Sequence, residues 1–396
     1  MRKNIFYSFL TVLAVAMTIA MILYPQSTFR GATFGLTTWA TVLIPALLPF
    51  FIISNILVEL GIVNFLGILL EPLMRPLFKQ PGASGFVLAM GFTSGFPMGA
   101  VLTNTLFEKN LVTKDEASRL IAFTNNSSPL FLLVAIPIGM FNNPNLGLIL
   151  LLAHYIANLT LGIFLGLTKK SSKNLDSYHP GNLLKRSWQE LLTFQKNSKA
   201  FGALLVSSVN KSIQNILMIG GFVIFFAVLI EILKETCLFY ILSLFFYKIL
   251  HFTGINPGLS EAVTIGFFEM TLGTQKASQI NAALTHQLMI VSLILGWSGL
   301  SIQAQVTSIA ARNNIPIGYY IFGRFFQGIL SLIFTLLFYY SLGHISPVGN
   351  FEIFQREYFS ILDLYYINFI ACLSILIILI ILSSFIKIAK TLKPRL

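Results

Sequence analysis

The chain has 396 residues, of which 56% are hydrophobic and only 10% are charged, and it carries a formal net charge of +12. A soluble protein usually has about a quarter charged residues, so this composition excludes an ordinary soluble globular protein. Many apolar runs reach the roughly 20 residues needed to cross the hydrocarbon of a bilayer. We therefore predict an all-α polytopic membrane protein.

The positive charge does not indicate a nucleic-acid partner. The basic residues lie in loops beside apolar runs, without a single basic patch interleaved with aromatic residues, which is typical of the positive-inside rule. The two cysteines, Cys237 and Cys372, fall in apolar segments and provide neither a disulfide framework nor a metal-ligand spacing.

About eight apolar segments are predicted to be full spans. In chain order they are Ile5–Tyr24, Thr33–Val58, Ile121–Met140, Leu146–Thr168, Ile216–Leu233, His286–Ala310, Ile317–Tyr340 and Leu362–Ile386. Two further apolar segments, Gly61–Phe78 and Cys237–Leu250, are expected to lie along the membrane surface, the first because it contains charged residues and prolines.

The basic residues set the predicted orientation. This layout places most of the 26 lysines and arginines on the cytoplasmic side, and only Arg30, Lys234, Lys248, Lys276 and Arg356 outside. We expect both termini to be cytoplasmic and the first apolar segment to be an uncleaved anchor.

Four apolar segments are interrupted by glycines, polar residues and prolines. Two of them, Ala83–Phe107 and Gly258–Leu284, are predicted to be re-entrant hairpins, and the other two breaks interrupt full spans at Asn125–Pro129 and Trp297–Ser301. Free backbone groups survive at membrane depth only where protein or a wet cavity covers them. Paired interruptions in two halves of a membrane protein indicate a transporter's binding site.

The order of segments in the two halves predicts an inverted repeat. The domains expected are an N-terminal membrane anchor helix (1–32), a first repeat (33–168), a basic cytoplasmic linker with an amphipathic helix (169–215), a second repeat (216–340), and an outer loop with a C-terminal span (341–396).

The interruptions carry the residues expected to bind a solute. A helix N-terminus at a break directs free N–H groups and partial positive charge toward the midplane, and glycines let the backbone approach a ligand closely. The predicted substrate-binding residues are Thr93, Ser94, Gly95, Phe96, Pro97, Gly99, Asn125, Asn126, Ser127, Ser128, Glu269, Thr271, Thr274, Gln275, Trp297, Ser298, Ser301, Gln303 and Arg324. A coupling Na⁺ is predicted at Asn125, Asn126 and Ser127, where carbonyls become free before a proline.

Two ionisable residues within apolar segments stand out. Glu269 is expected to carry a proton or bind a cation, because an ionisable group at membrane depth is costly, or else to be a solvated loop acid. Arg324 is expected to pair with a substrate carboxylate or with Glu231. His154 and Asn158, one helical turn apart, are interpreted as a packing pair. No cofactor is expected beyond a coupling Na⁺ or H⁺.

Four motifs resemble a known family. Leu47–Phe51, Glu71–Phe78, Ser94–Ala100 and Phe123–Phe131 are similar to the sporulation integral membrane proteins of the YlbJ type, which carry a Gate, or nucleoside-recognition, domain. The architecture is similar to that of concentrative nucleoside transporters, with two hairpins and two broken helices. The resemblance implies transport of dipicolinic acid across the outer forespore membrane. Phe96 departs from the family's Ser-Gly-Tyr-Pro pattern, and the second hairpin matches less well.

The function expected is a secondary transporter for a small planar anion, with dipicolinate as the implied solute. The alternatives are a nucleoside transporter, or an assembly protein of the spore envelope that does not transport. An enzyme is not expected, because the chain has no His-Glu-x-x-His motif, no Gly-x-Ser-x-Gly elbow and no glycine-rich Lys-Ser/Thr loop. The partners expected are the bilayer, the solute, and a second copy or other spore-envelope membrane proteins.

Overall fold

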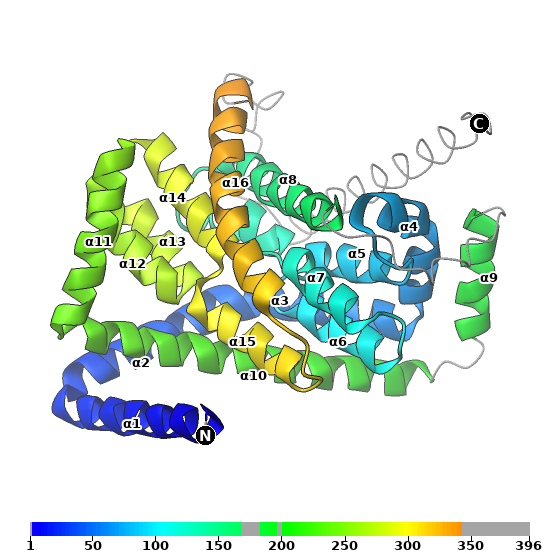
Figure 1. Cartoon of the computed structure of the whole chain (residues 1–396), viewed down its shortest axis with the longest axis horizontal. Helices are drawn as coiled ribbons and strands as arrows, with labels where there is room; N and C mark the ends of the chain where they lie inside the picture. The colour runs from blue at the N-terminus through cyan, green and yellow to red at the C-terminus, as the bar shows by residue number, and fades with distance from the viewer. Residues whose placement is uncertain (1, 168–182, 196–199, 343–396) are drawn as a thin grey trace.

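A computed structural model describes residues 2–167, 183–195 and 200–342, and every regular element in these ranges is a helix. The predicted span Leu362–Ile386 and the first part of the predicted linker, 169–182, lie outside the described residues. The all-helical class predicted from composition is confirmed (Figure 1).

The N-terminal segment forms two helices that meet at a sharp bend. Helix α1 (Arg2–Leu23) and helix α2 (Pro25–Thr38) are bent by 102° relative to each other at Tyr24. Pro25 is the first residue of α2, a position where a proline loses no intrahelical hydrogen bond. The π-helix η1 (Trp39–Leu43) and helix α3 (Ile44–Glu59) follow α2 without a gap. The continuous helical segment therefore begins at Pro25, before Thr33, the predicted start of this span.

The segment from α2 to α3 packs antiparallel to the long helix α10 (Phe201–Lys234). Gly31 lies against Val228, whereas Asn55 near the other end donates its Nδ2 hydrogen to Ser212 Oγ at 3.0 Å. The predicted span Ile216–Leu233 corresponds to α10. Its predicted start at Ile216 is wrong, because α10 begins at Phe201. The polar residues before Ile216 do not end the helix, since some of them, such as Ser212, find partners on α3.

Helices α4 (Ile62–Phe78) and α11 (Cys237–Thr253) follow the ends of this antiparallel pair. Helix α4 comes directly after α3, and α11 comes directly after α10, so the two lie at opposite ends of the pair (Figure 1). They coincide with the two segments expected to be surface helices, and their location along the membrane surface stays a prediction. The amphipathic helix α9 (Leu183–Gln195) packs against α4.

Both predicted hairpins form two short helices that pack against each other. The first consists of α5 (Ser84–Ser94) and α6 (Met98–Glu108), with Gly95 at a φ of 79° in the turn. The second follows the short 3-10 helix η3 (Pro257–Leu259) and consists of α12 (Ser260–Phe268) and α13 (Met270–Gln279). A left-handed φ is strained for residues other than glycine, which explains Gly95 at the tip. The hairpins' re-entrant position in a bilayer stays a prediction.

The two predicted helix breaks are also present, with different widths. Helix α7 (Lys114–Thr124) is followed by an extended segment and then by the π-helix η2 (Phe131–Ala135). Helices α14 (Leu284–Trp297) and α15 (Gly299–Ala311) are separated only by Ser298, which has a φ of 68°. The predicted span Ile121–Met140 is thus not one helix, and α7 begins earlier because Thr113 and Glu116 form a capping box.

Helices α8 (Leu146–Leu167) and α16 (Gly318–Leu342) complete the described fold. Four described helices are long and apolar enough to cross a membrane, and the bent α1–α2 pair raises that number to five. These four are Leu146–Leu167, Phe201–Lys234, Leu284–Ala311 and Gly318–Ser341. The count of about eight spans, the domain boundaries and the inverted repeat stay predictions.

Candidate functional site

A small cavity lies where the tips of both hairpins meet the first helix break. Its volume is about 40 Å³, which is room for a few waters. Its lining comes from the first tip, the second tip, the extended segment after α7, and the helices η1, α3, η2, α10 and α15. The lining residues are Leu43, Leu47, Ser94, Gly95, Phe96, Ser127, Ser128, Phe131, Ile219, Val223, Glu269, Met270, Thr271 and Ile302.

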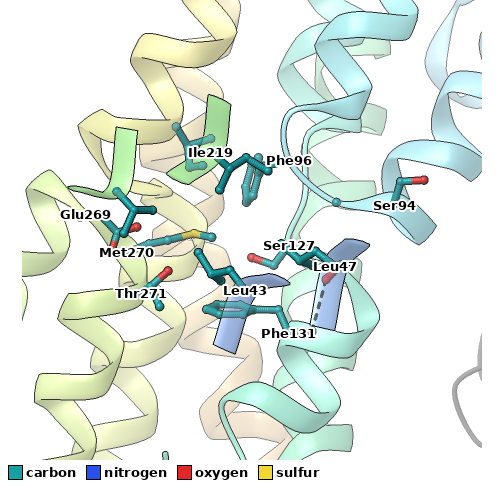
Figure 2. A pocket seen from close by; sticks show the side chains of 14 residues that line it. Leu43, Leu47, Ser94, Phe96, Ser127, Phe131, Ile219, Glu269, Met270 and Thr271 are labelled. Carbon is teal, nitrogen blue, oxygen red and sulfur yellow. Dashed lines mark hydrogen bonds between the residues drawn. The ribbon is translucent and has the colours of Figure 1, made fainter. Parts of the chain in front are cut away.

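The polar groups of the cavity lie on two sides of an apolar middle. Figure 2 shows Glu269 and Thr271 on one side and the Ser127 hydroxyl on the other, with the Met270 side chain between them. Phe96 lies at one edge of this arrangement, and Ser94 lies at the far end of the first tip. A mostly apolar pocket with a few convergent polar groups is typical of small-molecule sites.

Glu269 forms the turn of the second hairpin and caps the helix that follows. Its carboxylate accepts a hydrogen bond from Leu272 N at 2.7 Å, and its side chain is 1% exposed. A carboxylate at a helix N-terminus is favoured by the free N–H groups and by the macrodipole. No lysine or arginine in the described ranges forms an ion pair with Glu269. An ionised carboxylate buried without a cation is costly, so Glu269 is suited to carry a proton or to bind a cation.

The segment after α7 is held in an extended form by side chains from α8 and by the first hairpin. Asn125 Oδ1 accepts a hydrogen bond from Ala100 N at 3.0 Å, which ties the break to the start of α6. The Ser127 N–H donates to His154 Nε2 at 3.2 Å, and the Tyr155 hydroxyl donates to Ser127 O at 3.2 Å. The Ser127 N–H and carbonyl freed by the break thus have partners within the protein, as the absence of water in hydrocarbon requires.

Arg324 on α16 supplies further donors to the same break. Its Nη1 donates to Asn125 O at 2.7 Å, and its Nη2 donates to Ala122 O at 2.6 Å and to Asn158 Oδ1 at 3.2 Å. The last carbonyls of a helix have no intrahelical donor and attract a cation. Arg324, which is fully buried, therefore acts as a cap for the C-terminus of α7.

The prediction that Arg324 pairs with Glu231 is wrong. Glu231 forms ion pairs with Arg30 at 2.8 Å and with Lys234 at 2.6 Å, at the end of α10. The other alternative, a solute carboxylate at Arg324, stays a prediction.

The chain is similar to several known proteins. A family described as Gate, nucleoside recognition, matches residues 40–166. The sporulation integral membrane protein YlbJ of Bacillus subtilis is 40% identical over 329 residues, covering 81% of this chain and 80% of that protein. An uncharacterized protein of Alkalihalophilus pseudofirmus is 24% identical and covers 69% of this chain and 63% of that protein. A solved structure of CNTnw, in its intermediate 3 state, aligns at 11% identity with a TM-score of 0.44, covering 88% of this chain and 87% of that one.

The identity to the Bacillus subtilis protein decides the family. The chain belongs to the YlbJ family of sporulation integral membrane proteins. The resemblance seen in the four sequence motifs is thereby confirmed. The part of this chain that matches the Gate family, residues 40–166, contains the first hairpin and the first break. It therefore contains the half of the cavity formed by Phe96, Ser127 and Ser128.

The cavity brings together some of the residues that the sequence indicates and leaves others apart. Seven of them line it: Ser94, Gly95, Phe96, Ser127, Ser128, Glu269 and Thr271. The hydroxyls of Thr93 and Thr274 instead bond to carbonyls of their own helices, at 3.0 and 2.7 Å. Trp297 donates to Phe267 O, and Gln303 donates to Trp297 O, so both hold the second break together.

The remaining predicted site residues do not line the cavity. They are Pro97, Gly99, Asn125, Asn126, Gln275, Ser298, Ser301 and Arg324. The apolar half of the lining, such as Leu43, Phe131 and Val223, was missed because apolar residues inside apolar spans carry no distinguishing signal in one sequence.

The oxygens of the proposed Na⁺ site already accept hydrogen bonds. Asn125 O accepts from the Arg324 guanidinium, Asn126 Oδ1 accepts from Asn158 Nδ2 at 2.5 Å, and Ser127 O accepts from Tyr155. A guanidinium beside the break disfavours a second cation there. The Na⁺ site stays a prediction that this geometry does not favour.

Proposed function

We propose that the chain is a secondary transporter that moves dipicolinic acid, a small planar diacid, across the outer forespore membrane during sporulation. The observation that carries this proposal is the cavity at which both hairpin tips and the first break meet. Sites built from interrupted helices near the midplane are the usual arrangement in secondary transporters. The role in sporulation is carried over from the Bacillus subtilis relative, a sporulation integral membrane protein.

We take H⁺ rather than Na⁺ as the coupling ion of the proposal, because the oxygens of the predicted Na⁺ site already accept hydrogen bonds beside the Arg324 guanidinium. Glu269 is buried in the lining, and an ionised Glu269 would repel the carboxylates of the solute. A proton on Glu269 or on the solute removes this repulsion. The proposed cycle therefore binds solute and proton together and releases them together.

In the proposed cycle this arrangement is a closed state. A cavity of about 40 Å³ holds a few waters and not a planar diacid. The solute is admitted only when a hairpin tip moves away from the apolar residues opposite it, Ile219 and Val223 on α10. The proposed motion thus displaces the two hairpins relative to α10 and its antiparallel partner.

A nucleoside is the second candidate solute, because the family that matches residues 40–166 is described as nucleoside recognition. An assembly protein of the spore envelope is the alternative outside transport. For such a protein the polar breaks would serve packing alone, and their substitution would change folding rather than flux.

Uptake by vesicles containing the purified chain tests the proposal. Labelled dipicolinate and labelled uridine are offered separately, with an imposed pH gradient, with a Na⁺ gradient and with neither. We expect dipicolinate uptake above that of empty vesicles, stimulated by the pH gradient. Uptake of uridine alone would assign the nucleoside reading, and the absence of uptake under all conditions would contradict a transport function.

A further inference from the structure

Gln305 on α15 is fully buried, and neither atom of its side-chain amide has a hydrogen-bond partner. The Ser301 hydroxyl, one helical turn earlier on the same face of α15, is likewise buried and without a partner. On α6, Asn104 is 5% exposed, and its Oδ1 also has no partner. Nearly all buried polar groups in folded proteins are paired, so unsatisfied groups on two neighbouring helices need an explanation.

These three residues belong to helices that pack against each other, α6 and α15. Asn104 lies one turn before Glu108 on the same face of α6, and Glu108 Oε1 accepts a hydrogen bond from Asn313 Nδ2, just beyond the end of α15, at 2.8 Å. Asn104 therefore lies on the side of α6 that faces α15. Both helices begin at the cavity, because α6 follows the turn that contains Phe96 and Ile302 on α15 lines the cavity.

Gln287, a buried glutamine whose amide nitrogen has hydrogen-bond partners, contrasts with Gln305. Gln287 on α14 is also buried, and its Nε2 donates to Ala277 O at 3.1 Å and to Ile280 O at 2.8 Å. Gln80 and Gln327 are buried as well, and each lacks a partner for Oε1 but has one for Nε2. Gln305 has a partner for neither atom, and its amide presents a donor beside an acceptor with nothing bound to either.

We infer that Asn104, Ser301 and Gln305 form a polar subsite between α6 and α15, which binds a planar solute edge that carries a donor beside an acceptor. This inference rests on the proposed function. A protonated carboxyl group and the amide-like edge of a nucleobase both have this chemistry. The subsite extends the cavity along α6 toward Glu108, and it becomes occupied when α6 separates from α15.

The test compares one substitution at two buried glutamines, Gln305→Met and Gln287→Met, in the full chain. Replacing an unsatisfied polar group by an apolar one of similar shape removes a desolvation cost, whereas replacing a satisfied one leaves its partners unpaired. We expect Gln305→Met to raise the Tm in detergent by about 1–2 °C and Gln287→Met to lower it by a similar amount.

Uptake by vesicles then separates a subsite from a merely unsatisfied residue. Labelled dipicolinate at acidic pH and labelled uridine form two arms, which distinguish the carboxyl group from the nucleobase. We expect Gln305→Met to reduce uptake of the transported solute ~10-fold, because the solute edge loses its partners. Gln305→Asn, which keeps the amide, is expected to retain part of the uptake.

Two results overturn the subsite: a Gln305→Met variant no more stable than the wild type, or a more stable variant with unchanged uptake. If wild-type vesicles take up neither solute, the proposed function fails. In that case the subsite is tested by ligand binding alone, as the change in Tm on adding dipicolinic acid or uridine. A rise in the wild type that is absent in Gln305→Met would support the subsite, and no rise in the wild type would contradict it.

Discussion

Glu269 combines two roles that a single substitution can separate. As the cap of α13 its side chain needs only an acceptor oxygen, which a glutamine also supplies, whereas proton transfer needs an acid. We predict that Glu269→Gln gives normal protein levels and a Tm within about 2 °C of the wild type, but loses the stimulation of uptake by a pH gradient. The measurement is dipicolinate uptake with and without the gradient.

A matched control lies in the same hairpin. Glu261 on α12 is partly exposed and pairs with Lys276 at 2.9 Å. We expect Glu261→Gln to keep uptake driven by the pH gradient, because this acid does not line the cavity. Unchanged coupling in Glu269→Gln would exclude Glu269 as the proton carrier.

Arg324 is expected to act through the helix break that it caps. Arg324→Met leaves the carbonyls of Ala122 and Asn125 without this donor, which costs roughly 1–3 kcal/mol for each buried group. Arg324→Lys keeps a positive charge but loses the planar set of N–H donors of a guanidinium. We therefore expect its stability to lie between that of the wild type and that of Arg324→Met. The measurement is the Tm in detergent, with the exposed Arg312→Met as the control that leaves it unchanged. Equal stability of all four proteins would show that Arg324 does not hold the break.

At the scale of elements, the glycines of the first hairpin determine how closely it packs against the break. A Cβ on Gly91 would overlap the Thr124 carbonyl oxygen at the end of α7. At Gly95 a Cβ would lie 2.9 Å from Ser128 Cβ. The small residues thus let two interrupted segments meet backbone to backbone, as close helix packing in membranes requires.

This close approach predicts the effect of adding one methyl group. Gly91→Ala is expected to destabilise the protein by ~1–3 kcal/mol, because the backbone carbonyl opposite it cannot move away cheaply. Gly221→Ala is the control, since a Cβ there has no atom within 4 Å, and alanine favours a helix more than glycine does. Thermal unfolding in detergent measures both. A Gly91→Ala protein as stable as Gly221→Ala would refute the packing argument.

At the scale of the whole molecule, the antiparallel pair formed by α10 and the segment from α2 to α3 relates the two halves. Glu59 pairs with Lys211 at one end, and Arg30 pairs with Glu231 at the other. Because α4 and α11 follow opposite ends of this pair, they should lie on opposite sides of the membrane. This is the arrangement that an inverted repeat produces.

Thiol labelling in spheroplasts tests this arrangement. Cys237 at the start of α11 is exposed, and a membrane-impermeant maleimide should label it from outside when Cys372 is replaced by serine. A cysteine at Lys109, which is also exposed, should be labelled only after permeabilisation, in a background without Cys237. Labelling of both positions from the same side would contradict the predicted orientation.

The sequence by itself determined the features that depend on composition and on local chemistry. Low charge and long apolar runs predict the helical membrane class, and the breakers at Gly95, Asn125 and Ser298 predict where helices stop, because glycine, proline and polar residues act on the backbone within a few residues. The motifs around Pro97 and Pro129 predict the family. The start of α7 was missed although Thr113 and Glu116 have the local spacing of a capping box. The start of α10 was less predictable, because Ser212 is paired by Asn55 from a distant helix.

Only the tertiary structure decided which of these residues share a site. Glu269 and Ser127 meet at one cavity although 142 positions separate them, whereas Thr93 and Thr274 bond to their own helices. The partner of Arg324 could not be chosen from the sequence, since charge alone does not distinguish a carboxylate from the carbonyls of a broken helix. Long-range packing places side chains in space, and one sequence without its fold does not record those distances.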